Sequence, residues 1–307
     1  MPSFRAAPVR VRVPATSANL GPGFDALGLA LGLYDDVVVR VTDEGLDVDV
    51  AGEGAETLPR TARHLVVKAA RAAFKRLGGQ PRGLQVVCAN RIPQGRGLGS
   101  SAGAICAGIV AARALTLGGE HVLGPAATLA LAAEIEGHPD NVAACLHGGL
   151  TITWTTADGP RCVRLEPAAG VVPVVLVPER AVSTSRARAM LPATVPHADA
   201  ARTAGRAALL VEAITRRPDL LLDATEDALH QPYRAPAMAA SAALVARLRA
   251  DGVPAVVSGA GPSVLALASA ATAEHVVAAA PKRWWARPLP VERAGAAVLP
   301  LVAAPAP

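Results

Sequence analysis

A glycine- and serine-rich stretch constrains this chain more than any other feature of its sequence. Residues 90–104 read NRIPQGRGLGSSAGA, between the apolar segment LQVVCA at 84–89 and the small-residue run AICAGIVAARAL. This order predicts a buried strand, a tight loop and the start of a helix. Glycine accepts positive φ angles and lets a ligand approach the backbone closely. Because the free N–H groups and the positive dipole end of such a helix face the loop, the stretch favours an anion such as a nucleotide phosphate.

Two familiar glycine motifs do not describe this loop. A Walker loop requires a Lys before the final Ser or Thr, and a dinucleotide fingerprint reads GxGxxG, whereas here the register is GxGxG with no Lys before Ser100. The segment PxxxGLGSS at 93–101 instead resembles the phosphate loop of the GHMP kinases. A plain turn before an ordinary helix, capped by Ser100 or Ser101, is the alternative. The resemblance implies that ATP contacts Pro93, Gln94, Gly95, Arg96, Gly97, Leu98, Gly99, Ser100, Ser101, Ala102 and Gly103.

A second motif lies near the N-terminus. Residues 9–13 alternate as a half-buried strand, and PATSANLGPGFDALGLAL follows at 14–31. Its Gly-Pro-Gly turn leaves Asn19 and Asp25 as flanking polar groups, which could simply bond the local backbone. The motif resembles that of the homoserine kinases within the GHMP family, and this resemblance implies that both residues line the amino-acid pocket. Thr16 stands where other GHMP kinases often carry a Lys.

The segment EGHPDNV at 136–142 places four polar side chains, Glu136, His138, Asp140 and Asn141, within six residues between apolar helices. Such groups are costly to bury without a ligand or metal, although an exposed interhelical loop would also explain them. Asp140 or Asn141 is expected to cap the following helix. The resemblance to homoserine kinases implies that Glu136 and Ser100 hold Mg²⁺ and that His138 faces the substrate. It also places Asp140, Asn141 and Asp25 at the reaction centre, with Asp140 either a general base or an orienting group.

Three further segments complete the resemblance. STSRARAMLP at 183–192 and HQPYRAP at 230–236 contain arginines that are usually just solvated, and VVSGAGPSVLAL at 256–267 reads as a strand, a glycine turn and a strand. By resemblance to the homoserine kinases, these segments supply substrate-binding groups, with two guanidinium forks suited to a carboxylate. The residues so implied are Thr184, Arg188, Arg234, Gly259 and Gly261.

The pattern of elements fits an α+β protein. Strands are expected at 34–41 and 46–50, joined by a hairpin-like turn, and a helix at 61–77, opened by His64. His64 is either a simple helix-start residue or, by resemblance, a neighbour of adenine. A turn-rich segment at 157–170 suggests a boundary between residues 1–160 and 161–307. The resemblance implies a GHMP kinase fold, with an N-terminal domain like domain 2 of ribosomal protein S5, a ferredoxin-like C-terminal domain, and a homodimer.

Composition narrows the class of protein. Apolar residues make up 51% of the 307 residues and charged residues 18%, which favours a folded protein with ample core. The four cysteines lack CxxC spacing, and neither a signal peptide nor a membrane-length apolar run is visible, so a cytoplasmic protein is expected. The net charge of +5 is not gathered in basic runs and aromatic residues are 3%, which argues against a nucleic-acid partner.

Together the motifs predict a kinase that uses Mg-ATP to convert L-homoserine to O-phospho-L-homoserine, a step toward threonine. Two alternatives remain open at this point. One is another GHMP kinase, acting on mevalonate or a sugar, which would need a different acceptor pocket. The other is a nucleic-acid-binding protein with the S5-like fold and no catalysis, because fold alone does not fix function.

Overall fold

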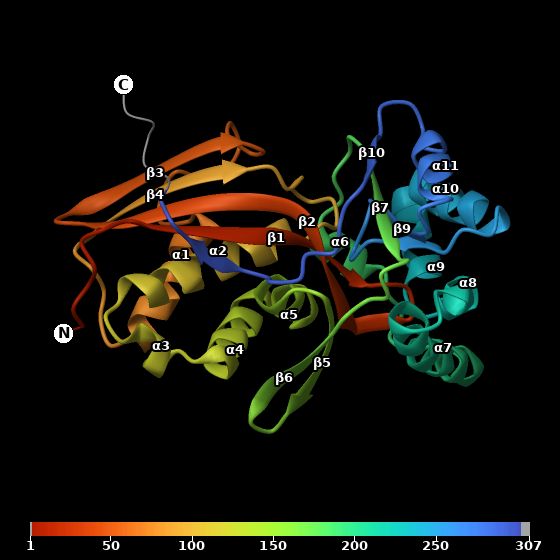
Figure 1. The fold of residues 1–307 in the computed structure, drawn as a ribbon, viewed down its shortest axis with the longest axis horizontal. Coiled ribbons are helices and arrows are strands. Elements are labelled where there is room, and N and C mark those ends of the chain that lie inside the picture. Colours follow the sequence, from red (N-terminus) through yellow and green to blue (C-terminus); the bar gives the residue numbers. More distant parts are fainter. Residues whose placement is uncertain (1, 302–307) are drawn as a thin grey trace.

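The computed structural model describes residues 2–301 and contains two β-sheets with helices packed on them (Figure 1). The first sheet has seven strands in the order β11-β1-β2-β4-β3, with β5 paired to β2 and β6 to β5. These strands are β1 (Val9–Asn19), β2 (Gly23–Thr42), β3 (Gly45–Gly52), β4 (Gly83–Asn90), β5 (Leu150–Thr156), β6 (Gly159–Leu165) and β11 (Ala297–Leu299).

Helices from the N-terminal half cover one face of this sheet, below it in Figure 1. They are α1 (Leu65–Arg76), α2 (Ser100–Leu115), α3 (Gly119–Val122), α4 (Pro125–Glu136) and α5 (Asp140–His147). The core between sheet and helices contains the fully buried Phe74 and Ile109 together with small residues of α2. It also encloses Cys88, Cys106 and Cys145, whose thiols are buried and form no disulfide.

The second sheet has four antiparallel strands in the order β10-β7-β9-β8. Its strands are β7 (Val172–Val177), β8 (Ala255–Val257), β9 (Val264–Ala268) and β10 (Trp285–Pro288). Its helical elements are α6 (Thr184–Ala189), α7 (His197–Thr215), η1 (Pro218–Leu220), α8 (Leu221–Ala224), α9 (Gln231–Arg234), η2 (Ala235–Met238), α10 (Ala239–Ala250) and α11 (Ala273–Ala278). The chain order β7-α10-β8-β9-α11-β10, together with the strand order β10-β7-β9-β8, is a ferredoxin-like topology. The family resemblance implied this topology for the C-terminal domain.

The two sheets share a hydrophobic core, which places the ends of β1 and β2 against the second sheet. Leu20 and Leu29 from the first sheet belong to the same buried cluster as Leu210 of α7 and Leu265 of β9. Strand β7 alternates, because Val175 faces this shared core while Val174 packs with α10 and α11. The loop between β1 and β2 is therefore held at the junction of the two halves.

A strand pairing, a helix start and the position of a proposed domain division differ from the sequence-based expectations. The hairpin expected between 34–41 and 46–50 is wrong, because β4 lies between β2 and β3, antiparallel to one and parallel to the other. The helix expected at 61–77 begins at Leu65, with His64 as its N-cap residue. The segment 157–170 contains β6, which extends the first sheet as a hairpin with β5, so the proposed division at residue 160 falls inside that hairpin.

Candidate active site

A cavity of about 180 Å³ lies where the motifs meet, at the junction of the two halves. It is lined by Asn19, Asp25, Gly95, Gly97, Leu98, Gly99, Ser100, Ser101, Glu136, His138, Asp140, Asn141, Arg188, Arg234, Gly259 and Ala260. Segments that are far apart in the chain, from the β1–β2 loop to the β8–β9 turn, therefore contribute to a single pocket. Only Ala260 in this lining was missed by the sequence reasoning, and its place in the SGAGPS turn was the available signal.

Seven of the predicted ligand-binding residues lie outside this cavity. Gln94 lines a neighbouring cavity, and Gly261 packs against Met238 beneath the β8–β9 turn. Thr184 begins α6, but its side chain is outside what the structure describes. The others are Pro93 and Arg96, on the outer side of the loop, and Ala102 and Gly103, which are buried in α2.

The glycine loop has the backbone that its sequence requires. Gly95, Gly97 and Gly99 all have positive φ, at 64°, 74° and 69°. Gly99, not a serine, is the N-cap residue of α2, so the alternative of a serine cap is excluded and the hydroxyls of Ser100 and Ser101 are available to other partners. A Cβ on Gly97 would overlap the carbonyl oxygen of Ser258, which shows that the loop is pressed against the β8–β9 turn.

Thr16 supports the same loop from β1. A Cβ on Gly99 would overlap the hydroxyl of Thr16, and that hydroxyl donates a hydrogen bond to Oδ1 of Asn141, 2.8 Å away. Thr16 is fully buried. At position 16 this chain therefore has a neutral group that joins the glycine loop to the start of α5.

The polar cluster of 136–141 lies at the junction of α4 and α5. Gly137 ends α4 with a φ of 91°, and Pro139 is the N-cap residue of α5, so the expected cap by Asp140 or Asn141 is wrong. Instead, Asp140 is the first residue of α5, 2% exposed, and its Oδ1 accepts hydrogen bonds from the Asn141 amide at 2.7 Å and from Nδ1 of His138 at 2.6 Å. The bond to Asp140 raises the pKa of His138.

Glu136 points toward the first turn of α2. Its Oε1 accepts a hydrogen bond from the hydroxyl of Ser101 at 2.6 Å, whereas Ser100 has no such bond to it. Burial raises the pKa of Glu136, and the bond from Ser101 offsets this in part. Glu134 turns away and pairs with Arg76 on the surface, as expected from helical geometry. A buried carboxylate of this kind is stabilised by a bound cation.

The other side of the cavity carries charged groups around Phe24. Arg188 forms a two-pronged ion pair with Asp25, at 3.0 and 2.8 Å. Arg234 is 2% exposed and donates from Nε to the carbonyl oxygen of Ala187, which ties α9 to α6. Both guanidinium groups lie over the ring of Phe24, at 5.8 and 5.2 Å from its centroid.

The backbone of the β1–β2 loop is strained where it faces the cavity. Asn19, Leu20 and Asp25 have positive φ angles of 69°, 51° and 54°. Such conformations are uncommon outside glycine and are found most often at functional sites. The side chain of Asn19 compensates by bonding the Asp25 amide and the Gly259 carbonyl oxygen, at 3.0 and 2.8 Å.

A second cavity, of about 260 Å³, adjoins the glycine loop and shares Gly95, Ser100 and Ser101 with the first. Its walls include apolar side chains of β1, β2 and α1. Asp35 lines it and accepts the amide hydrogens of Arg91 and Ile92 at 2.6 and 2.9 Å, fixing the start of the loop. His64 also lines it, and neither ring nitrogen has a hydrogen-bond partner in the described part of the chain.

Comparison with known proteins agrees with the fold. The sequence matches the family models described as "GHMP kinases N terminal domain" at residues 64–149 and "GHMP kinases C terminal" at residues 203–286. A homoserine kinase from Streptomyces avermitilis is 68% identical over 302 residues, which cover 98% of this chain and 99% of that protein. One from Streptomyces coelicolor is 68% identical over 303 residues, which cover 99% of this chain and 98% of that protein.

A solved structure gives the same result. The crystal structure of homoserine kinase from Cytophaga hutchinsonii matches with a TM-score of 0.83 at 26% identity, covering 97% of this chain and 99% of that one. The chain belongs to the GHMP kinase family, and within it to the homoserine kinases. The predicted α+β GHMP kinase fold is thereby confirmed.

Proposed function

We propose that this chain transfers the γ-phosphoryl group of ATP to the primary hydroxyl of L-homoserine, giving O-phospho-L-homoserine and ADP. The observation that carries the proposal is the cavity that joins a glycine loop, an acidic cluster and a set of two arginines with a carboxylate. A homoserine zwitterion needs groups for both an ammonium and a carboxylate, and Arg188, Arg234 and Asp25 supply them. Mevalonate and sugars carry no ammonium group, so they would not use the carboxylate of Asp25, which would stay paired with Arg188.

The nucleotide would lie across the two adjoining cavities. The 95–101 amides and the start of α2 suit the phosphates, since they offer N–H groups and a positive dipole end. The base would occupy the partly apolar cavity beside His64, whose unbonded ring nitrogens could meet polar atoms of adenine. Burial lowers the pKa of His64, which favours the neutral ring there.

Glu136 and the hydroxyls of Ser100 and Ser101 fit a magnesium ion. They are oxygen donors beside the phosphate loop, and Mg²⁺ in kinases usually takes one or two carboxylates together with substrate phosphates. Within residues 2–301, no cluster of three or more His, Cys, Asp or Glu forms a complete protein site, which agrees with a site shared with the nucleotide. When bound, the ion would neutralise charge on the transferred phosphoryl group.

The chain's own residues would mainly position the acceptor. Because Asp140 already accepts hydrogen bonds from His138 and the Asn141 amide, we assign it an orienting role. It would fix the His138 ring and the start of α5 against the homoserine hydroxyl. Asn141, held by Thr16, would be the second orienting group.

The cellular location and the oligomeric state are proposed from the family resemblance. No helix in the described part of the chain combines the length and the apolar character needed to cross a bilayer. We propose a cytoplasmic homodimer, as the resemblance to homoserine kinases implies. Analytical ultracentrifugation at several protein concentrations would test the dimer.

The direct test is a coupled ADP-release assay with Mg-ATP and homoserine, threonine, mevalonate or galactose as acceptor. The proposal predicts turnover with homoserine far above that with the others. Preferential turnover of mevalonate or galactose would favour the alternative that the chain is a GHMP kinase acting on mevalonate or a sugar. No turnover, together with tight and strongly salt-dependent RNA binding, would favour the nucleic-acid alternative.

A further inference from the structure

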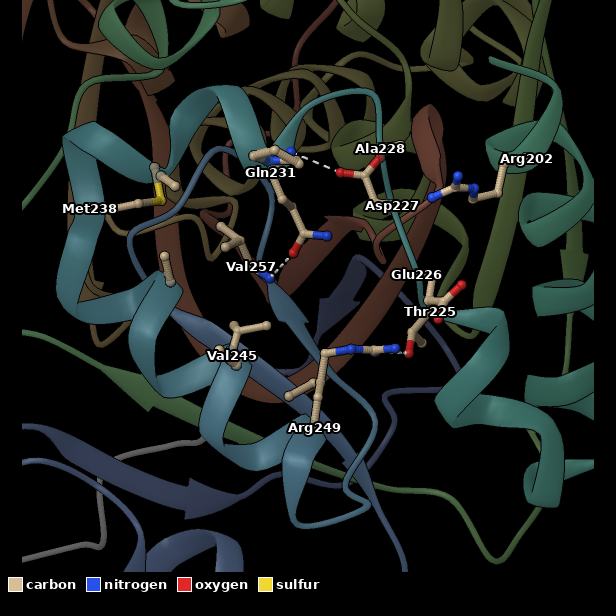
Figure 2. Close-up of a pocket in the computed structure, with 15 residues that line it drawn as sticks. Arg202, Thr225, Glu226, Asp227, Ala228, Gln231, Met238, Val245, Arg249 and Val257 are labelled. Carbon is tan, nitrogen blue, oxygen red and sulfur yellow. Dashed lines mark hydrogen bonds between the residues drawn. The ribbon is translucent and has the colours of Figure 1, made fainter. Parts of the chain in front are cut away.

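A larger cavity, of about 390 Å³, lies in the C-terminal half (Figure 2), and α9 contributes residues both to its lining and to that of the active-site cavity. It is enclosed by the segment after α8, by α9 and η2, by α10 and by β8. Its lining consists of Arg202, Thr225, Glu226, Asp227, Ala228, Gln231, Pro232, Ala235, Met238, Ala242, Val245, Ala246, Arg249, Ala255 and Val257. Its volume is typical of small-molecule sites.

One wall of the cavity is apolar, and Figure 2 shows Met238, Val245 and Val257 grouped on it. The apolar surface is broad enough to receive a ring or a branched chain. The polar groups are concentrated at the opposite side, with Arg249 and Thr225 at one end and Arg202 at the other. The cavity is therefore amphipathic.

Arg249 is the most distinctive polar group of this cavity. It is half-buried, and it donates hydrogen bonds only to neutral oxygens, the Thr225 hydroxyl and the Leu222 carbonyl, each at 2.7 Å. Within residues 2–301 no carboxylate lies within 4.0 Å of it. A partly buried cation with no carboxylate in contact, on which Glu226 and Asp223 act only from a distance, favours an anionic partner.

The acidic residues of the lining do not supply that partner, because both are already engaged. Glu226 pairs with Arg206 at 2.9 Å. The Asp227 carboxylate accepts the amide hydrogens of Leu229, His230 and Gln231, at 2.8, 3.2 and 2.8 Å. The charged residues of the lining are formally balanced, and among the described residues Arg249 is the cation of the lining that makes no ion pair within 4.0 Å, since Arg202 pairs with Asp199.

We propose that this cavity is a second ligand site, which binds a small monocarboxylate with an apolar ring or branched chain. The carboxylate would accept hydrogen bonds from Arg249, and the apolar body would pack on Met238, Val245 and Val257. A guanidinium is well suited to a carboxylate because its N–H groups form a planar fork.

The site is connected to the active site through α9. Gln231 lines the cavity and accepts the Val257 amide at 2.7 Å, and Asp227 bonds the first amide of α9. At the other end of this four-residue helix, Arg234 lines the active-site cavity. An occupant would hold α9 against β8, so it should order Arg234 and strengthen homoserine binding.

Calorimetry with phenylacetate tests the binding site, with 2-phenylethanol as the analogue without the carboxylate. Saturable binding of phenylacetate is expected, with weaker binding of the alcohol. Arg249→Gln should weaken phenylacetate about ten- to a hundred-fold, the usual effect of losing a hydrogen bond to a charged group. Arg247→Gln, on the exposed side of the same helix, should bind phenylacetate as the wild type does.

A second variant guards against a folding defect in Arg249→Gln, because Arg249 also bonds Thr225 and Leu222. Ala242→Leu places a larger side chain in the cavity, which reduces the free volume, and it removes no hydrogen bond. Phenylacetate binding should therefore be lost while basal turnover persists. Absence of saturable phenylacetate binding to the wild type would overturn the proposal. Unchanged affinity in both Arg249→Gln and Ala242→Leu would do so as well.

The kinetic consequence rests on the proposed homoserine kinase activity, whereas the binding measurements do not. At saturating phenylacetate the KM for homoserine should fall several-fold in the wild type and stay constant in Ala242→Leu. An unchanged KM in the wild type, with binding confirmed, would refute the link through α9 and leave the catalytic assignment intact.

Discussion

Arg188 donates from both terminal guanidinium nitrogens to the two carboxylate oxygens of Asp25, at 3.0 and 2.8 Å. The family resemblance implied that both residues line the acceptor pocket, with the guanidinium of Arg188 suited to a carboxylate. In the structure they neutralise each other instead. An incoming zwitterion carries both charges. Its carboxylate can replace Asp25 as the partner of Arg188, and its ammonium can replace Arg188 as the partner of Asp25.

This pair should matter for binding and little for stability. The two side chains are 46% and 35% exposed, and exposed ion pairs contribute about 0–1 kcal/mol. Arg188→Gln should therefore change the free energy of unfolding by less than about 1 kcal/mol. It should raise the KM for homoserine about ten- to a hundred-fold, and leave the KM for ATP nearly unchanged. Arg186→Gln, on the exposed side of the same helix, is the control. Equal rises in both KM values for Arg188→Gln would contradict the assignment.

Gly97 tests how the glycine loop is supported. A Cβ there would obstruct a phosphate that approaches the backbone, and the structure also places the Ser258 carbonyl in its path. Gly97→Ala should therefore displace the β8–β9 turn and raise the KM for both ATP and homoserine. Gly45→Ala has a similar φ, 79° against 74°, with nothing within 4 Å, so it should show only the backbone strain of about 1–2 kcal/mol. Loss of ATP binding alone in Gly97→Ala would show instead that the added Cβ obstructs only the nucleotide.

The motifs indicated which segments would line the cavity, because each combines glycine with polar residues. Glu136, His138, Asp140 and Asn141 are close in sequence, so their meeting followed from the sequence alone. The pairing of Ser101 rather than Ser100 with Glu136 did not, because it depends on the rotation of α2 relative to α4.

Long-range pairing was the main source of error. Strand β4 enters between β2 and β3, and no local pattern in residues 34–50 signals an insertion from residues 83–90. The cavity of about 390 Å³ in the C-terminal half also could not be predicted from the sequence. Arg249 lies in an ordinary alanine-rich helix, and its lack of a carboxylate partner depends on how α8 packs against α10.

Asp35 predicts a specific pH dependence of stability. Burial raises its pKa from 3.8 to about 6, and the two amide hydrogen bonds offset this only in part. Its contribution is therefore fully favourable below pH 3.8 and is lost as the pH rises through about 6. Asp35→Asn keeps an acceptor for Arg91 and Ile92 without the buried charge. Relative to wild type it should gain up to about 3 kcal/mol in the free energy of unfolding at pH 7.5, and this gain should vanish near pH 4. Urea denaturation at both pH values measures it, and a pH-independent difference would be evidence against the prediction.

Glu136→Gln separates the proposed magnesium ligand from a structural role. The amide keeps the shape and can still accept from Ser101, so the melting temperature should not fall. Turnover should fall on the order of a hundred-fold or more, because charge stabilisation by a metal ion is worth several kcal/mol. A magnesium titration should show a higher half-saturating concentration. Glu134→Gln removes only a surface pair with Arg76 and should be nearly silent. Normal turnover of Glu136→Gln at ordinary magnesium would exclude it as the ligand.

Arg234 gives the sharpest test of the acceptor. It is buried over Phe24, donates hydrogen bonds to the Ala187 carbonyl and to Nδ1 of His230, and lines the acceptor pocket. Arg234→Lys replaces the guanidinium fork with a point charge and should cost about 1–3 kcal/mol in kcat/KM for homoserine, and Arg234→Ala should cost more. With 1,4-butanediol, which has the hydroxyl but neither charge, wild-type turnover should be very poor and the penalty of Arg234→Ala should largely disappear. If Arg234→Ala reduced kcat/KM equally for both acceptors, Arg234 would act in phosphate chemistry or through the position of α6, and recognition of the homoserine carboxylate would have to be assigned elsewhere.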